Sequence, residues 1–134
     1  MSLTARDPVD GDPAMLAPGA RRMRQLGMLK VHSLRAGDIH VIELDGELDI
    51  AGAPAVERAL KRAEACGAST VVLDLRRLRF IDTSGLRVVV LAHRRRAGRL
   101  ALVRGSPAVQ RVFEICGLAQ RLPFVDETPG ASNM

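Results

Sequence analysis

VVLDL at residues 71–75 and, six residues later, DTSGL at residues 82–86 are the two stretches that decide the fold of this chain. The first is almost entirely apolar and begins with two β-branched residues, which is typical of a central strand buried on both faces. From Leu86 the apolar positions recur at helical spacing, so the second stretch predicts a strand-to-helix turn with Asp82, Thr83 or Ser84 as the N-cap. Ser84 then lies where backbone N–H groups and the helix dipole favour an anion such as phosphate.

Strand and helix patterns alternate on both sides of these stretches. Apolar-alternating runs at residues 28–34 and 39–44 are joined across Gly37, which predicts a hairpin. The alternation slips between Val41 and Ile42, which indicates either a bulge or an inner strand covered on both faces. The order then predicts an α/β fold with a mostly parallel mixed sheet of about five strands, the first antiparallel to the second. The remaining predicted elements are helix 53–66, strand 70–75, helix 84–97, strand 99–103, helix 107–116 and strand 122–125.

Length and composition predict one domain. The chain has 134 residues, of which 47% are hydrophobic, and this is enough for a single modest core. Residues 1–25 contain Asp-Pro, Asp-Gly and Ala-Pro-Gly steps without periodicity, which predicts a mobile N-terminal tail. We therefore expect the domain at residues 26–127 and a flexible C-terminal tail at residues 128–134.

The net charge of +5 raises the question of nucleic-acid binding. The basic run at residues 93–96 falls in the last turns of a predicted helix, where cations favour the negative end of the dipole, so a solvated helix end is the simpler interpretation. The only aromatic residues are three Phe, and no zinc-knuckle, RNA-binding or helix-turn-helix pattern occurs. We expect no direct contact with nucleic acid, and a basic RNA-binding module is the alternative from a different class.

Cysteine and histidine positions do not predict a metal site or a cofactor. Cys66 and Cys116 lie fifty residues apart without paired histidines, and His32, His40 and His93 fall on different elements. No apolar run is long enough to span a bilayer, and the N-terminus lacks a signal pattern. We therefore expect a cytoplasmic protein without membrane contact and with two unpaired, partly buried thiols; a redox-sensitive pair is the alternative.

Four collinear segments between about residues 28 and 125 together resemble the STAS domain of bacterial anti-sigma factor antagonists. The segment at residues 78–86 resembles the phosphorylation-site loop of that family. The resemblance implies a single STAS-like domain. The four segments are GELD at residues 46–49, LRFIDTSGL at 78–86, SPAV at 106–109 and VFEICGL at 112–118.

The same resemblance implies that Ser84 is the phosphate acceptor, with Thr83 as the rival. Its implied partners are an anti-sigma factor that is also a serine kinase, and a phosphatase for phospho-Ser84. Loops after the carboxyl ends of adjacent parallel strands form one rim, so the loops at residues 46–52 and 76–84 should be neighbours. A loop or helix cap is an equally open interpretation of Asp49. The implied partner-binding residues are Asp49, Asp82, Thr83, Gly85 and Leu86.

Ser84 lacks the surroundings of a catalytic nucleophile. No histidine falls on the predicted rim, and Asp82 and Leu86 stand where a Gly-x-Ser-x-Gly elbow has glycines. A Gly-rich phosphate loop with a lysine is also missing from the sequence. We therefore expect a substrate and not an enzyme.

The expected function is partner switching in the regulation of transcription. The unmodified chain would bind the anti-sigma factor and free the sigma factor, and the added phosphate charge would abolish binding. The alternatives are a STAS subunit of a lipid-transport complex or stress-signalling scaffold, or the cytosolic part of an anion transporter. A monomer or weak dimer is expected.

Overall fold

The VVLDL stretch lies in β4 (Thr70–Ile81), the central strand of a computed structural model that describes residues 22–26, 28–96 and 98–129. All three predicted helices and all five predicted strands are present, with ends that differ by a few residues in most cases. The other elements are β1 (Arg22–Leu26), β2 (Leu29–Ala36), β3 (Ile39–Leu48), α1 (Ala53–Ala65), α2 (Thr83–Arg95), β5 (Leu100–Val103), α3 (Pro107–Ile115) and β6 (Phe124–Val125).

The sheet order follows the chain order, β1-β2-β3-β4-β5-β6. The pairs β1–β2 and β2–β3 are antiparallel, and the pairs from β3 to β6 are parallel. Gly37 occupies the predicted hairpin turn between β2 and β3 with a φ of 61°. These findings confirm the α/β class, the mixed sheet and the antiparallel first pair of the prediction.

β1 is a sixth strand, and the sequence prediction places most of it in the N-terminal tail. Its backbone pairs with β2 from Arg22 opposite Ser33 to Leu26 opposite Leu29. Its sequence, RMRQL, has no run of β-branched or aromatic residues, so its pairing with β2 is a tertiary effect that local propensity does not indicate. The other residues of the two predicted tails lie largely outside the described residues, which exclude 1–21 and 130–134.

β3 and β4 both run farther toward the carboxyl rim than the sequence predicts. Their parallel pairing continues to Leu48 opposite Ile81, through two register shifts at each of which β4 has one residue more than β3. The extra residues break the alternation of inward and outward side chains in β4. β3 keeps its alternation to Leu48, but Asp45 and Gly46 are residue types that are typical of a turn. Segments 46–48 and 76–81, which the prediction assigns to loops, are therefore strand.

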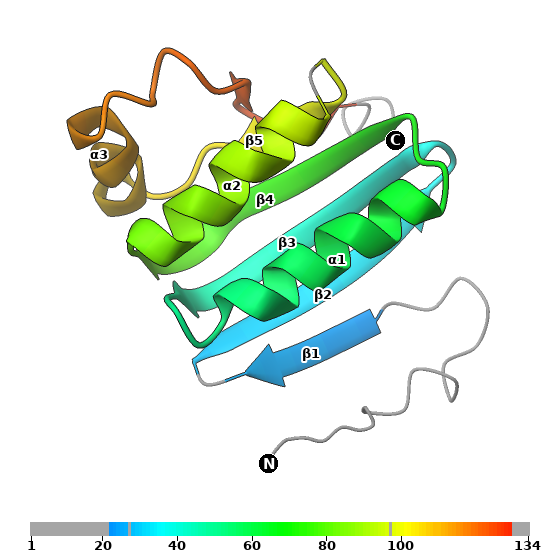
Figure 1. Cartoon of the computed structure of the whole chain (residues 1–134), viewed down its shortest axis with the longest axis horizontal. Helices are drawn as coiled ribbons and strands as arrows, with labels where there is room; N and C mark the ends of the chain where they lie inside the picture. The colour runs from blue at the N-terminus through cyan, green and yellow to red at the C-terminus, as the bar shows by residue number, and fades with distance from the viewer. Residues whose placement is uncertain (1–21, 27, 97, 130–134) are drawn as a thin grey trace.

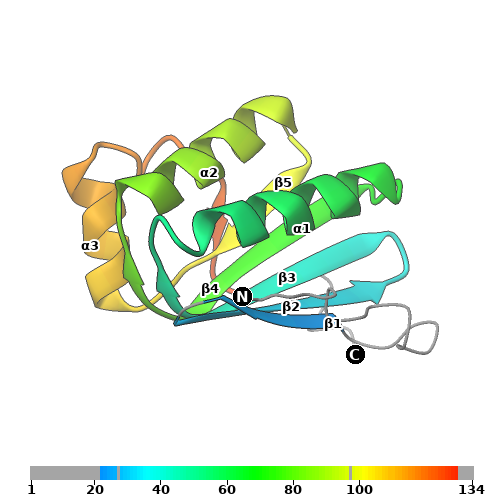
Figure 2. The ribbon, with the colours of Figure 1, turned by 60° about the horizontal axis from the view of Figure 1, so that its bottom comes forward.

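The helices α1 and α2 lie side by side over one face of the sheet, and α3 packs against β4 (Figures 1 and 2). The main apolar core fills the space between this face and the helices. A smaller apolar cluster contains Val41, Val72, Ala101 and Val103. Since successive strand residues point to opposite faces, the burial of both Val41 and Ile42 confirms an inner strand covered on both faces as the cause of the slipped alternation.

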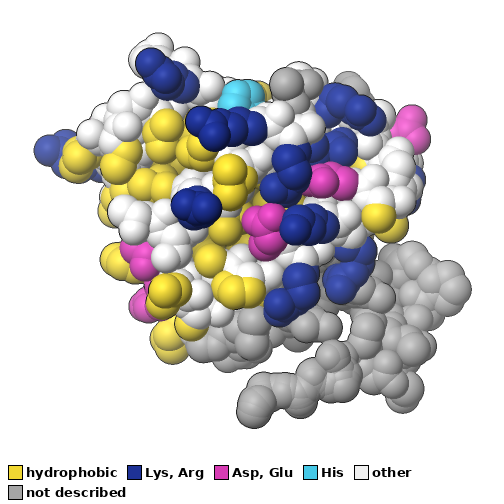
Figure 3. Space-filling model, viewed as in Figure 1, with side chains coloured by type: hydrophobic (Ala, Val, Ile, Leu, Met, Phe, Trp, Pro, Cys, Tyr) yellow, Lys and Arg dark blue, Asp and Glu magenta, His cyan; other side chains and the backbone are white. Residues whose placement is uncertain are grey.

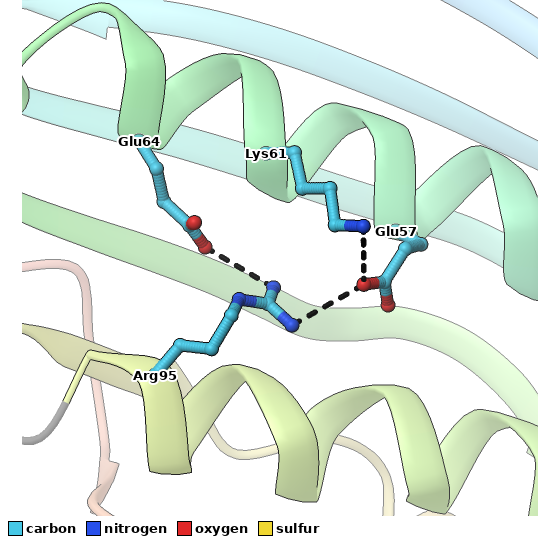
Figure 4. A network of polar contacts seen from close by, with 4 residues as sticks. All are labelled: Glu57, Lys61, Glu64 and Arg95. Carbon is cyan, nitrogen blue, oxygen red and sulfur yellow. Dashed lines mark hydrogen bonds and ion pairs between the residues drawn. The ribbon is translucent and has the colours of Figure 1, made fainter.

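The basic run at the end of α2 is only in part the solvated helix end that the sequence predicts, because Arg94 and Arg95 are exposed but Arg96 is not. Arg95 lies between two carboxylates of α1, with Nη1 3.2 Å from Oε2 of Glu57 and Nη2 3.1 Å from Oε2 of Glu64 (Figure 4). Arg96 is buried, and its Nη2 donates to the carbonyl of Ala68 at 3.0 Å. Two consecutive arginines thus hold α2 in place, which weakens the RNA-binding interpretation.

Cys66 and Cys116 are both free, as expected, but they are exposed and not partly buried. Each is the residue that caps the C-terminus of a helix, α1 or α3, where the chain turns away from the core. The end of α1 and the helix α3 lie at opposite ends of the molecule (Figure 1). A disulfide within one chain is therefore excluded by distance.

The part of the chain that the structure describes shows neither a metal-ligand cluster nor a membrane-spanning helix. It contains no group of three or more His, Cys, Asp and Glu side chains that could hold a metal ion. None of its helices combines the length and apolar character needed to cross a membrane.

His40, near the start of β3, predicts a pH dependence of stability. Burial lowers the pKa of His40 below its ordinary value of 6.5, and the charges of Arg35 and Arg62 lower this pKa further. As the pH falls, the unfolded chain therefore takes up the proton first. We expect the His40 contribution to the free energy of unfolding to be complete above pH 6.5 and to be lost as the pH falls toward the lowered pKa.

Urea denaturation of the chain and of His40→Gln at several pH values, from about 7.5 to about 5, measures this contribution. The free energy of unfolding of the variant should fall less over this range than that of the native sequence. Equal pH dependence in the two proteins would contradict the assignment to His40.

Candidate functional site

The DTSGL stretch forms the start of α2 at the carboxyl ends of β3 and β4. Asp82 is the N-cap: its Oδ1 accepts hydrogen bonds from the backbone N of Ser84 at 2.9 Å and of Gly85 at 3.2 Å. The backbone N of Asp82 donates to the carbonyl of Leu48 at 3.1 Å. Of the three candidate caps, Asp82 therefore takes the role, because its carboxylate satisfies two first-turn amides.

Thr83 and Ser84 follow the cap and differ in exposure: Thr83 is exposed, and Ser84 is half-buried. The sequence predicts free N–H groups at this helix start, whereas the Asp82 carboxylate already accepts from two of them. The Ser84 side chain thus lies at the surface on the rim, but the backbone around it has fewer free donors for an anion than a bare helix end.

Gly85 and Leu86 fix where α2 begins. A Cβ atom on Gly85 would lie 2.7 Å from Cγ of Leu48 and 2.8 Å from Cγ1 of Ile81, which are both buried at the strand ends. Leu86 is 6% exposed and belongs to the main core. Direct partner contact by these two residues stays a prediction; their packing indicates that they position Ser84.

Asp49 caps the loop that follows β3. Its Oδ1 accepts hydrogen bonds from the backbone N of Ala51 at 3.0 Å and of Gly52 at 3.3 Å. The backbone bond between Leu48 and Asp82 holds this loop beside the start of α2, as the strand order predicts. The capping interpretation of Asp49 is therefore correct, and a contact with a partner stays a prediction.

Two apolar surface features near the rim are missing from the sequence prediction. Ile50 is 75% exposed and Phe80 is 48% exposed. Apolar side chains also gather on the surface over α2 and α3, with isolated basic side chains among them (Figure 3). Helical spacing in the sequence shows which faces of α2 are apolar, but it does not show which of these faces the other elements leave exposed.

A groove of about 420 Å³ follows α2. It is lined by Thr83, Leu86, Arg87, Val90, Leu91 and Arg94.

Asp74, the one polar residue of the VVLDL stretch, belongs to an ion pair and not to the rim. It is buried, and Nη2 of Arg76 lies 2.7 Å from its Oδ2 while the backbone N of Arg76 donates to its Oδ1 at 3.0 Å. This hydrogen bonding raises the pKa of the Arg76 guanidinium, against the effect of burial. Asp74 is thus satisfied within β4 and has a structural role.

The chain resembles known proteins over most of its length. The sequence model of the STAS domain family matches residues 30–131 of this chain. BtrV of Bordetella bronchiseptica, provisionally named an anti-sigma factor antagonist, is 37% identical over 92 residues, which are 66% of this chain and 79% of BtrV.

Two solved structures of the anti-sigma factor antagonist SpoIIAA are also similar to this chain. The unphosphorylated form is 28% identical, with a TM-score of 0.60 over 85% of this chain and 93% of SpoIIAA. The phosphorylated form, from Bacillus, is 27% identical, with a TM-score of 0.55 over 85% of this chain and 96% of SpoIIAA. The protein therefore belongs to the STAS domain family, among relatives named anti-sigma factor antagonists.

Proposed function

We propose that this protein is an anti-sigma factor antagonist whose partner binding is switched by phosphorylation of Ser84. The unmodified chain binds an anti-sigma factor that is also a serine kinase, and the sigma factor is released. The kinase transfers the γ-phosphoryl group of ATP to Oγ of Ser84, with release of ADP and the hydroxyl proton. The phosphorylated chain no longer binds, and a phosphatase restores it.

The single observation that carries this proposal is the position of Ser84. It follows the N-cap Asp82 at the carboxyl rim of the sheet, where its side chain is partly accessible. The relative SpoIIAA has been solved in an unphosphorylated and a phosphorylated form, and both are similar to this chain over 85% of its length. A phosphate switch on the same fold is therefore physically reasonable for Ser84.

The surroundings of Ser84 support the role of a substrate and not of a nucleophile. His93 lies nine residues farther along α2, about 13 Å along the helix axis. His40 lies near the start of β3, at the opposite end of the parallel strands from Ser84. His32 is on β2, two strands away from β4 in the sheet. A serine nucleophile needs a base within hydrogen-bond distance, and none of these histidines is close enough.

The charge around Ser84 supports the direction of the switch. The Asp82 carboxylate lies in the same turn and accepts from the amide of Ser84 itself. A phosphate adds about −1.5 to −2 charge beside this carboxylate, and a partner surface that closes over the rim must desolvate both groups. With unmodified Ser84 only the Asp82 carboxylate must be desolvated, and two backbone amides already donate to it.

The acceptor assignment predicts the result of a phosphorylation assay. With the cognate kinase and ATP, the full chain should gain the mass of one phosphoryl group, and Ser84→Ala should gain none. Thr83→Ala is the matched control, since it removes the neighbouring hydroxyl, and it should gain the group as the native chain does. Intact mass spectrometry reads all three. A gain in Ser84→Ala would overturn the assignment to Ser84.

A further inference from the structure

A phosphate on Ser84 finds few free donors in the backbone. The amides of Ser84 and Gly85 donate to the Asp82 side chain, and the amide of Leu86 donates to the Asp82 carbonyl at 3.0 Å. The Asp82 carboxylate also repels the phosphate. The occupied amides and the Asp82 carboxylate therefore offset most of the attraction between the helix dipole and a phosphate. The phosphate dianion needs a basic side chain close by to balance its charge.

Arg87 is the only basic residue in the sequence within four positions of Ser84. It lies three positions after Ser84 on α2, and residues at this spacing are neighbours on a helix surface. Helical side chains also point toward the N-terminus, which directs Arg87 toward the first turn. Arg87 is exposed and lines the same groove as Thr83, at the beginning of the helix.

The other arginines of α2 are less suitable for this role. Within the described part of the chain, Arg87 has no ion pair, whereas Arg95 is held by Glu57 and Glu64. Arg94 lines the far part of the groove, seven residues after Arg87 and about 10 Å farther along the axis. Among the arginines of α2, Arg87 is thus the one whose guanidinium is available near Ser84.

We propose that Arg87 pairs with the phosphate of phospho-Ser84 and holds it as a dianion at neutral pH. This inference rests on the proposed function only in taking Ser84 as the modified residue. The pair forms within one turn of α2, so it needs no movement of the helix. It also draws the Arg87 guanidinium away from the groove, so modification changes the charge of that surface at two neighbouring positions.

The ionisation of the phosphate tests this pairing without any partner. The full chain is produced with phosphoserine incorporated at position 84 during synthesis, and ³¹P NMR follows the second ionisation of the phosphate, whose ordinary pKa is about 6. In Arg87→Gln this pKa should rise by about 0.5, because the neighbouring cation is lost. Arg87→Lys should restore part of the difference.

Arg94→Gln is the matched control, since it removes the same charge from the same helix at a greater distance, and its phosphate pKa should equal that of the native sequence. An unchanged pKa in Arg87→Gln, or an equal rise in Arg94→Gln, would overturn the pairing. The thermal midpoints of the unmodified variants verify that each is folded. The titration uses no kinase, so it can be interpreted even if the phosphorylation assay fails to show Ser84 as the acceptor. Conversely, a titration that contradicts the Arg87 pair does not affect the result of the phosphorylation assay.

Discussion

Phosphorylation of Ser84 is expected to weaken binding of the proposed anti-sigma factor kinase by at least about 100-fold and to leave the fold unchanged. The loss arises in the complex, where the partner excludes the water that solvates the phosphate. The Asp82 carboxylate remains in the same turn and adds repulsion at short range. An unpaired or partly paired phosphate under an interface costs several kcal/mol, and about 2.7 kcal/mol already corresponds to a 100-fold loss of affinity.

In the free protein the opposing effects of the phosphate nearly cancel. The helix dipole contributes tenths of a kcal/mol up to about 1 kcal/mol in its favour, weakened by solvent and by the capped amides, and the proposed pair with Arg87 acts in the same direction. Repulsion from Asp82 acts in the opposite direction. We therefore expect the free energy of unfolding to change by less than about 1 kcal/mol.

Titration calorimetry with the full chain carrying serine or phosphoserine at position 84 measures the affinity. A chain with phosphoserine at position 69 is the charge-matched control, because Ser69 is exposed just before β4, at the other end of the sheet. That control should bind as the unmodified chain does. Amide NMR shifts on modification of Ser84 should cluster around residues 46–52 and 80–88. Unchanged affinity, or shifts spread over all strands, would contradict the switch.

Gly85→Ala is expected to lower the free energy of unfolding by about 2 kcal/mol. Helix propensity alone predicts the opposite sign, since alanine stabilises a helix interior by about 1 kcal/mol relative to glycine. Packing outweighs this preference, because the new Cβ would lie 2.7 Å from Leu48 and 2.8 Å from Ile81. Both side chains are almost fully buried and have little room to move.

Urea denaturation of Gly85→Ala and of Thr83→Ala separates the two effects. Thr83 is exposed in the same turn, so its replacement introduces no steric overlap and should change the free energy of unfolding by less than about 0.5 kcal/mol. A more stable Gly85→Ala would show that the strand ends can open, and that the glycine does not fix the start of α2.

The sequence predicts the alternating part of this fold well because each element there has a local signal. Pro107 after Ser106 marks the start of α3, and Ser106 accepts a hydrogen bond from Val109 as an N-cap should. β1 has no such signal, since its strand character depends on pairing with β2. The long end of β4 is missed because the register shifts disrupt the period on which sequence prediction depends. The end of β3 is missed because Asp45 and Gly46 are typical of a turn.

The sequence predicts where the candidate site lies, but it does not predict the hydrogen bonds and ion pairs around it. Asp82 and Ser84 follow from the pattern of a strand, a polar cap and a helix. The sequence offers three candidate N-caps and does not show which one is used. Only the structure shows that Asp82 is the N-cap and that it accepts hydrogen bonds from two first-turn amides. The role of Arg95 depends on carboxylates that are more than thirty positions away in the chain and become neighbours only when α1 and α2 pack together.

The bridge from Arg95 to α1 has a consequence for how such proteins diversify. The ion pairs of Arg95 hold the C-terminal end of α2. The Asp82 cap and the close packing of Gly85 hold its N-terminal end, so the position of α2 does not depend on the outward side chains between the two ends. Arg87, Val90 and Arg94 can therefore vary without loss of the scaffold. When a genome holds several copies of this domain, the copies can therefore differ along this stretch while they share one scaffold.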